Sequence, residues 1–237
     1  MRNLATLVQE MELHYSAQVV IPALNEEPGI GLTIAEMKDI LGEVSVLVVD
    51  GKSSDRTVEI AKNLGAKVLF QDGIGKGDAF AKALEHVDLD IDYVILTDAD
   101  HTYPAEYIPE MICVLENNPK VGMVCGNRFS IKLQGKAFQS RFTFGNKLLA
   151  LAHNILNGID LQDPLTGLRV IRADILRKWT VKSKGFDMEV ELNHQVTKQG
   201  YQTIEIPIVY RERMGEKKLK MKHGATILRR IMTETLS

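Results

Sequence analysis

The sequence predicts an α/β protein built on a mostly parallel sheet, and two observations favour this class. Over the first 126 residues, short runs rich in β-branched residues alternate with segments of helical periodicity, which is typical of βαβ units. Four such crossovers follow one another, and a crossover helix joins parallel strands. In chain order, strands are expected at residues 18–21, 44–49, 66–70, 93–97 and 121–125.

Helices are expected between these strands, near residues 29–41, 55–64, 76–86 and 104–117. The last begins with a proline, which fits the first turn of a helix. After Arg128 the pattern changes, and we expect this second half of the chain to cover the active edge of the sheet. Its expected parts are a long, partly apolar helix at 138–156, a segment at 160–172, a helix at 187–199 and a final strand at 203–210.

The expected organisation is one catalytic domain over residues 17–210, an N-terminal extension over 1–16 and a basic amphipathic tail over 211–237. The tail carries a helical apolar pattern at 225–232 with no obvious core partner. Its lysines and arginines predict contact with an anionic membrane surface. A solvated basic tail is the alternative.

Composition excludes some classes of protein. The chain has 237 residues, a formal net charge of −2 and 25% charged residues, so it lacks the excess of basic residues expected of a general nucleic-acid binder. Its two cysteines, Cys113 and Cys125, form no disulfide framework or metal motif, and a reducing cytoplasm is the simplest setting. No apolar run is long enough to span a bilayer.

Two carboxylates stand at the end of the expected strand 93–97, in Asp98-Ala99-Asp100. The carboxyl ends of parallel strands are where α/β proteins build their sites. Two aspartates separated by one small residue can direct oxygen ligands at one Mg²⁺ or Mn²⁺, while substrate phosphates complete its shell. A turn or a helix cap is the common alternative for this triplet taken alone.

Two further polar loops follow strands at the same predicted edge. The first strand leads into Pro22-Ala23-Leu24-Asn25-Glu26, and the second into Asp50 and the polar run up to Thr57. One ligand could therefore contact Asp50 through a nucleotide base and the Asp98/Asp100 pair through a metal-bound diphosphate. An ordinary turn with Asp55 as the helix N-cap is the alternative for this second loop.

The glycine-rich run Gly73-Ile74-Gly75-Lys76-Gly77 matches neither of two familiar phosphate motifs. A P-loop needs Ser or Thr after Gly-Lys, and a dinucleotide fingerprint would follow the first strand rather than the third. We expect a flexible loop that covers the donor.

Taken together, the motifs resemble a known family. PALNEE, VVDGKSSDRT, DGIGKGDAF, LTDADHTYP, GNRF, DPLTGLRV, FDMEVE and PIVYRER are similar in order and spacing to the family 2 inverting glycosyltransferases of GT-A fold. The resemblance is strongest to the polyprenyl-phosphate (dolichyl-phosphate) mannosyl- and glucosyltransferases, and it runs from Gln18 to Lys222.

The resemblance implies a role for each matching position. Asp98 and Asp100 would bind the metal, Arg128 and Arg141 would hold the acceptor phosphate together with Thr166, and Asp163 and Gly167 would lie beside the reaction centre. Asp98, Asp100, Arg128, Arg141 and Asp163 are the expected catalytic residues. The donor-binding positions would be Pro22, Leu24, Asn25, Glu26, Asp50, Lys76, Asp98, Ala99 and Asp100.

Three positions depart from the family pattern. Leu24 stands where Tyr is common and Gly51 where a second Asp is usual, so we expect the contact with the nucleotide base to be unlike that of guanine-specific relatives. Gly145 falls where some relatives place a Ser near the acceptor phosphate, which weakens the match at the acceptor.

The expected function is transfer of a hexose from a nucleotide-diphosphate sugar of the GDP-mannose or UDP-glucose type to a polyprenyl phosphate, with inversion. The protein would lie on the cytoplasmic face of a membrane. A family 2 enzyme acting on a hydroxyl acceptor is one alternative, with Asp163 or Glu189 as its base. A nucleotide-sugar-binding module without turnover is the other.

Overall fold

The computed structural model describes residues 15–88, 90–129, 141–177, 179–216, 218 and 223–234. The expected N-terminal extension lies outside the described residues, apart from Tyr15 and Ser16. Most of the basic stretch 217–222 also lies outside them. Among the helices described, none combines the length and the apolar character that a membrane span requires.

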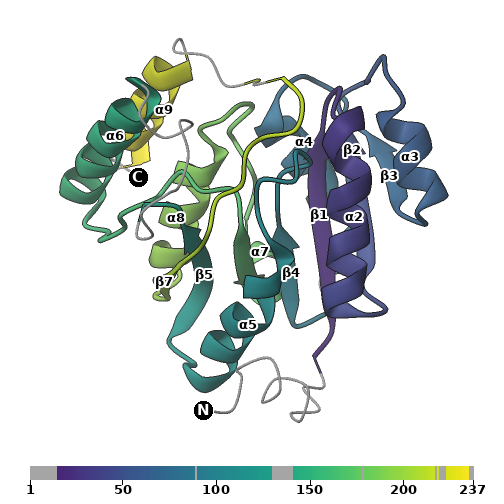
Figure 1. Ribbon diagram of the computed structural model, residues 1–237. Helices are drawn as coiled ribbons and strands as arrows, with labels where there is room; N and C mark the ends of the chain where they lie inside the picture. The colour runs from purple at the N-terminus through teal and green to yellow at the C-terminus, as the bar shows by residue number, and fades with distance from the viewer. Residues whose placement is uncertain are drawn as a thin grey trace.

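A seven-stranded sheet forms the centre of the protein (Figure 1), in the order β3-β2-β1-β4-β6-β5-β7. The pairs β1–β2, β1–β4, β2–β3 and β5–β7 are parallel, which confirms the predicted mostly parallel α/β class. The strands are β1 (Ala17–Ala23), β2 (Ser45–Asp50), β3 (Lys67–Phe70), β4 (Tyr93–Leu96), β5 (Val121–Asn127), β6 (Arg169–Arg172) and β7 (Gln202–Pro207).

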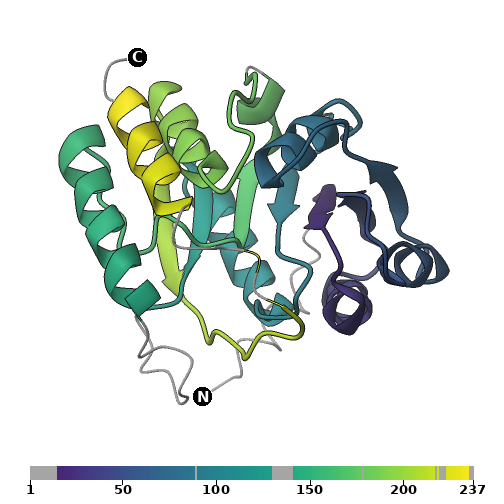
Figure 2. The same ribbon diagram turned by 90° about the horizontal axis from the view of Figure 1, so that it is seen from above.

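Helices cover both faces of the sheet (Figure 2), so the central strands are apolar on both sides. One core layer packs α2, α3 and α5 against the sheet through residues such as Ile34, Ala61 and Met111. The other packs α4, α7 and α8 through residues such as Phe80 and Leu192. The helices are α2 (Glu27–Leu41), α3 (Thr57–Asn63), α4 (Lys76–Leu84), α5 (Ile108–Asn117), α7 (Ala173–Arg177) and α8 (Met188–Lys198), with a 3-10 turn at Ala105–Tyr107 before α5.

One strand runs against the others. β6 lies between β4 and β5 and is antiparallel to both, whereas the segment expected at 160–172 was given no strand. The strand at 169–172 was missed because a four-residue run is too short to show a strand period. Leu96 at the end of β4 pairs with Arg169 at the start of β6. The loop before β6 therefore lies at the edge where the parallel strands end.

Two helices lie side by side beyond the sheet, next to α8 (Figures 1 and 2): α6 (Arg141–Asn157) and α9 (His223–Glu234). Ile227 and Ile231 of α9 are buried and cluster with Val190 of α8, and Arg230 Nε lies 3.0 Å from Asp187 Oδ2. The expectation that the apolar pattern at 225–232 lacks a core partner is therefore wrong.

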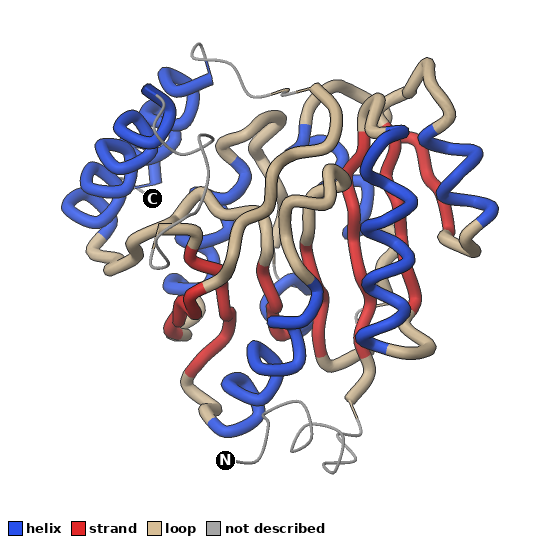
Figure 3. The backbone as a smooth tube through the Cα atoms, in the orientation of Figure 1, coloured by secondary structure: helices blue, strands red, loops and turns tan. Residues whose placement is uncertain are grey.

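Between β7 and α9 the chain crosses the carboxyl edge of the sheet, where loops gather in Figure 3. We call residues 208–216 the crossing segment. Its backbone N–H groups donate from Ile208 to the Asn127 carbonyl (3.1 Å), from Arg211 to Thr102 (3.0 Å) and from Met214 to Asp100 (3.1 Å). The C-terminal part of the chain thus reaches the loop that holds the Asp98/Asp100 pair.

Candidate active site

The site lies at the carboxyl ends of β1, β2 and β4, where three adjacent loops hold residues in the left-handed backbone region. Asn25 (φ 48°), Lys52 (φ 68°) and His101 (φ 59°) follow these strands in turn. Such a conformation is unfavourable for a residue with a side chain, and it persists where the surrounding structure enforces it. The three loops are therefore held by their neighbours, as hydrogen bonds from Asn25 N to Ser53 Oγ (2.8 Å) and from His101 N to Thr33 Oγ1 (3.1 Å) show.

Asp98 is paired with a lysine. Lys76, the first residue of α4, places Nζ 2.7 Å from Asp98 Oδ1 and 2.7 Å from Glu189 Oε1. Although burial alone would lower it, these two carboxylates hold the pKa of Lys76 above its ordinary value. The same contact, acting against burial, keeps the pKa of Asp98 low. Lys76 is thus a permanent cation beside an ionised Asp98.

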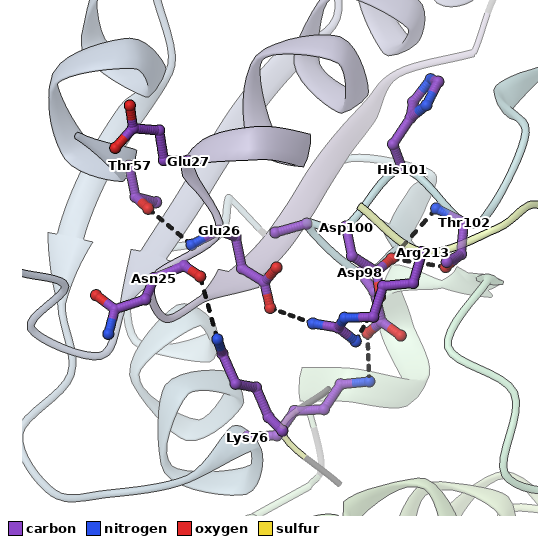
Figure 4. A network of polar contacts seen from close by, with 12 residues as sticks. Asn25, Glu26, Glu27, Thr57, Lys76, Asp98, Asp100, His101, Thr102 and Arg213 are labelled. Atoms are coloured by element: carbon purple, nitrogen blue, oxygen red, sulfur yellow. Dashed lines mark hydrogen bonds and ion pairs between the residues drawn. The ribbon is translucent and has the colours of Figure 1, made fainter. Parts of the chain in front are cut away.

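Asp100 is buried and both its oxygens have neighbours (Figure 4). Oδ1 accepts hydrogen bonds from the Thr102 hydroxyl (2.6 Å) and the Thr102 N–H (3.2 Å). Oδ2 lies 2.6 Å from Nη1 of Arg213 in the crossing segment, and Arg213 Nη2 also contacts Glu26 Oε1. Burial raises the pKa of Asp100, and the negative charge of the nearby Asp98 raises it further. Burial also raises the pKa of Glu26 to about 7, against the influence of Arg213.

A divalent metal fits this set of residues. The Asp100 Oδ2 and Glu26 Oε2 atoms are buried and have no hydrogen-bond partner in the described structure, although Asp100 Oδ2 has its ion pair with Arg213. Four carboxylates, those of Glu26, Asp98, Asp100 and Glu189, face two cations, Lys76 and Arg213. Carboxylate oxygens are the ligands that Mg²⁺ and Mn²⁺ prefer. No group of three or more His, Cys, Asp or Glu suited to a metal occurs among the described residues. Mg²⁺ commonly binds through one or two carboxylates, with substrate phosphates as further ligands.

The Asp50 loop is a closed local turn. Asp50 is fully buried, and its carboxylate accepts hydrogen bonds from the Ser53 N–H (2.8 Å) and the Ser53 hydroxyl (2.5 Å). Asp55 Oδ1 accepts from the Thr57 N–H (3.0 Å), but the N-cap of α3 is Arg56, so Asp55 lies one residue before the position that the capping alternative gave it. Leu24 is 41% exposed beside this turn. The role of Asp50 in base binding stays a prediction.

The glycine-rich run before α4 does not form an open loop at its end. The N–H of Gly77 donates to the Gly185 carbonyl (3.1 Å), and a Cβ at Gly75 or Gly77 would collide with the carbonyls of Lys184 or Ser183. These glycines allow two backbones to approach closely, which fixes Lys76 beside Asp98. Only Ile74, at 86% exposure, extends freely from the run.

Arg128 and Asp163 form a buried ion pair near Asp98. Arg128 donates from Nε to Asp163 Oδ2 and from Nη2 to Oδ1, each at 2.7 Å, and its N–H also donates to Oδ2 at 3.0 Å. Its guanidinium lies 5.4 Å from the Tyr210 ring centroid. Despite burial, Asp163 holds the pKa of Arg128 far above its ordinary value.

The loop from Asp163 to Gly167 joins this pair to Asp98. A Cβ at Gly167 would lie 2.7 Å from Asp98 Oδ2, and the Gly167 N–H donates to the Tyr103 hydroxyl at 2.7 Å. Thr166 is fully buried and its hydroxyl lacks a hydrogen-bond partner in the described structure. Arg141 begins α6, but its side chain lies outside the described residues.

The structure brings together most of the predicted site residues and adds two. The loops after β1 and β4, the start of α4 and the loop before β6 meet around Asp98 and Asp100, and the loop after β2 contacts the loop after β1. Sequence reasoning gave no role to Arg213, and it considered Glu189 only as a base. Both lie in motifs that it quoted, PIVYRER and FDMEVE, so the motif match marked the segments without revealing their partners.

Comparison with solved structures identifies the class. The chain is similar to glucosyl-3-phosphoglycerate synthase from Mycobacterium tuberculosis, crystallised with Mn²⁺, uridine diphosphate and glucosyl-3-phosphoglycerate. The TM-score is 0.73 over 100% of this chain and 84% of that chain, at 18% identity. At this identity the match establishes the fold, which is the GT-A fold of glycosyltransferases. The model of glycosyl transferase family 2 matches residues 18–180, and the chain belongs to this family.

Two curated relatives match over most of their length. A dolichyl-phosphate hexose transferase from Haloferax volcanii is 36% identical over 205 residues, which cover 85% of each chain. An undecaprenyl-phosphate mannosyltransferase from Micrococcus luteus is 30% identical over 84% of this chain and 86% of its own. The glycosyltransferase AglJ from Haloferax volcanii is 33% identical, and the chain spans 62% of its length.

Proposed function

We propose that this glycosyltransferase moves a hexose from a nucleotide-diphosphate sugar to a polyprenyl phosphate, with inversion at the anomeric carbon. The proposal rests on the observation that both carboxylates considered as bases are already paired with cations. Asp163 is fully buried and accepts two side-chain hydrogen bonds from Arg128, and Glu189 forms an ion pair with Lys76. A hydroxyl acceptor needs a base to take its proton. A phosphate monoester, with a second pKa near ~6, is already a dianion at neutral pH and needs none.

In the proposed reaction an oxygen of the acceptor phosphate attacks the anomeric carbon and forms a C–O bond. The bond from that carbon to the diphosphate oxygen breaks, and the nucleoside diphosphate leaves with the electron pair. Asp98 and Asp100 would hold Mg²⁺ or Mn²⁺, which supplies charge stabilisation for the leaving diphosphate. Lys76 adds a fixed positive charge beside Asp98, and such preorganised charge favours the transition state.

The donor is proposed to lie across the three loops after β1, β2 and β4. The nucleoside end would be bound by residues of these loops, namely Pro22, Leu24, Asn25, Glu26, Asp50 and Ala99. GDP-mannose and UDP-glucose are the two donor types considered. The names of the Haloferax and Micrococcus relatives support a polyprenyl-phosphate acceptor, which Arg128, Arg141 and Thr166 would contact.

The test is a transfer assay with GDP- and UDP-sugars, a short polyprenyl phosphate and Mg²⁺ or Mn²⁺. We expect a sugar-linked lipid product, loss of activity with chelator and loss with Asp98→Asn. Transfer to a soluble hydroxyl acceptor at equal or higher kcat/KM would instead favour the first alternative. Ligand-dependent thermal stabilisation without any turnover would favour the binding module.

We also propose that the protein acts as a peripheral protein on the cytoplasmic face of a membrane, and the outer surface of α6 and α9 supports this. Leu148, Leu151 and Ile155 form one stripe on α6, with exposures of 58%, 56% and 71%. From 148 to 157 this helix contains no Asp, Glu, Lys or Arg. Leu228 and Met232 add an exposed apolar pair on the neighbouring α9.

The charge around this stripe suits an anionic surface. Arg229 is exposed on α9, and four lysines lie in the sequence 217–222 just before this helix. An apolar face flanked by basic residues favours the interface of an anionic bilayer. A lipid-linked acceptor would be presented at the same surface.

Co-sedimentation with anionic vesicles tests this surface. Ile155→Glu should reduce binding at low salt, while Leu32→Glu, at a 47% exposed leucine of α2, should leave it unchanged. Point variants are preferable to deletion of the tail, because removing α9 would uncover Val190. Equal binding by the wild type and Ile155→Glu would contradict the proposal.

A further inference from the structure

Arg213 places a positive charge next to two carboxylates of the site. Arg213 is the only residue of the described crossing segment that contacts both Asp100 and Glu26, and it approaches Asp100 Oδ2 to 2.6 Å. Its side chain is 26% exposed, whereas that of Asp100 is 1% exposed. Figure 4 shows the guanidinium between the two carboxylates. It therefore places a positive charge against two buried carboxylates of the site.

The crossing segment holds this guanidinium in place from both sides. On one side, Arg211 donates to both oxygens of Glu36, at 2.6 and 2.8 Å, and its N–H donates to the Thr102 carbonyl. On the other, the Met214 N–H donates to the Asp100 carbonyl. Because backbone and side-chain contacts fix the residues around Arg213, its position does not depend on the single ion pair.

Each oxygen of Asp100 already has a neighbour. Oδ1 accepts two hydrogen bonds from Thr102, and Oδ2 is in contact with Arg213. A bound Mg²⁺ lies about 2.1 Å from its ligand oxygens, and a guanidinium in contact with the same oxygen would repel it. A metal that binds Asp100 must therefore displace Arg213.

We propose that Arg213 competes with the divalent metal for Asp100 and thereby makes metal binding depend on the nucleoside diphosphate. Displacement leaves the buried part of a guanidinium without its carboxylate, which is unfavourable. A diphosphate that arrives with the metal offers new oxygens for this cation, since Arg geometry matches phosphate well. Metal and nucleotide then bind with positive coupling, and each binds weakly alone. This inference rests on the proposed metal-dependent function.

The experiment measures Mn²⁺ binding to the full chain by electron paramagnetic resonance and calorimetry, with and without GDP or UDP. For the wild type we expect weak Mn²⁺ binding that strengthens at least tenfold with nucleotide. For Arg213→Ala we expect Mn²⁺ alone to bind several-fold more tightly and the coupling with nucleotide to fall. Arg213→Lys, which keeps the charge, should stay near the wild type.

Arg211→Ala is the matched control. It loosens the same segment but leaves Asp100 paired, so Mn²⁺ affinity without nucleotide should not rise. Unchanged or weaker Mn²⁺ binding by a folded Arg213→Ala variant would overturn the competition, and Arg213→Gln serves in its place if the alanine variant does not fold. Absence of Mn²⁺ binding to every variant, even with nucleotide, would overturn the proposed metal-dependent function as well. The two failures are therefore distinguishable.

Discussion

Replacing Asp163 with Asn tests whether this carboxylate is structural or acts as a base. The carboxylate is fully buried and accepts three hydrogen bonds from Arg128, whose side chain is only 12% exposed. Removing one member of a buried ion pair destabilises a protein by about 3–5 kcal/mol. Asn keeps one acceptor oxygen, so we expect a value near the lower end, about 3 kcal/mol. In a protein of this size that corresponds to a melting temperature lower by about 6–12 °C.

The assay is urea unfolding of four proteins: the wild type, Asp163→Asn, Arg128→Met and the double variant. Each single variant leaves one buried partner without its counterpart, so the double variant should be less destabilised than the sum of the singles, with a coupling energy of about 1–3 kcal/mol. Transfer activity is measured in parallel below the unfolding transition. If Asp163→Asn unfolds like the wild type yet loses transfer by a thousandfold or more, Asp163 is a base and the argument for a phosphate acceptor fails.

Three further predictions follow from single residues. Asp50→Ala should weaken binding of the nucleoside diphosphate by about 1–3 kcal/mol, as measured by calorimetry. An unchanged affinity would mean that the nucleotide base does not contact Asp50. Burial lowers the pKa of His153 to about 4, from about 6.5 in the unfolded chain. The unfolded state therefore binds the proton first, and the free energy of unfolding should fall by about 3 kcal/mol more in the wild type than in His153→Gln as the pH drops from 7 to 4. Gly77→Ala should destabilise the protein, because its Cβ meets the Ser183 carbonyl, whereas Gly145→Ala on α6, with nothing within 4 Å, should be neutral or stabilising by up to about 1 kcal/mol. Equal melting temperatures for these two glycine variants would refute the packing role assigned to Gly77.

Local patterns in the sequence were sufficient to predict the first five strands of the sheet. β1 to β5 lie where apolar β-branched runs were found, and α2 to α5 lie between them, because burial on both faces leaves a strong signature. The loop residues at the strand ends could also be predicted, since parallel strands place their carboxyl ends on one edge.

What escaped prediction depends on contacts between distant residues. β6 owes its position to partners on both sides, and α9 owes its buried face to α8. The ion pair of Arg213 with Glu26 joins residues 187 positions apart, and no local pattern reports such a distance. The place of Asp163 beside the reaction centre, which the resemblance implies, stays a prediction, and only the structure reveals that Arg128 pairs with its carboxylate.

The reversed strand β6 also determines the order in which the protein can assemble during synthesis. In the part of the chain that the structure describes, β5 pairs with β6 and β7, and both follow it in the sequence. The first four strands, by contrast, pair among themselves. A growing chain can therefore pair these four strands while β5 still lacks a neighbour. An unpaired strand edge can associate with other chains. Arg213 is made later still, so Asp100 gains its counter-ion only after the whole sheet has been translated.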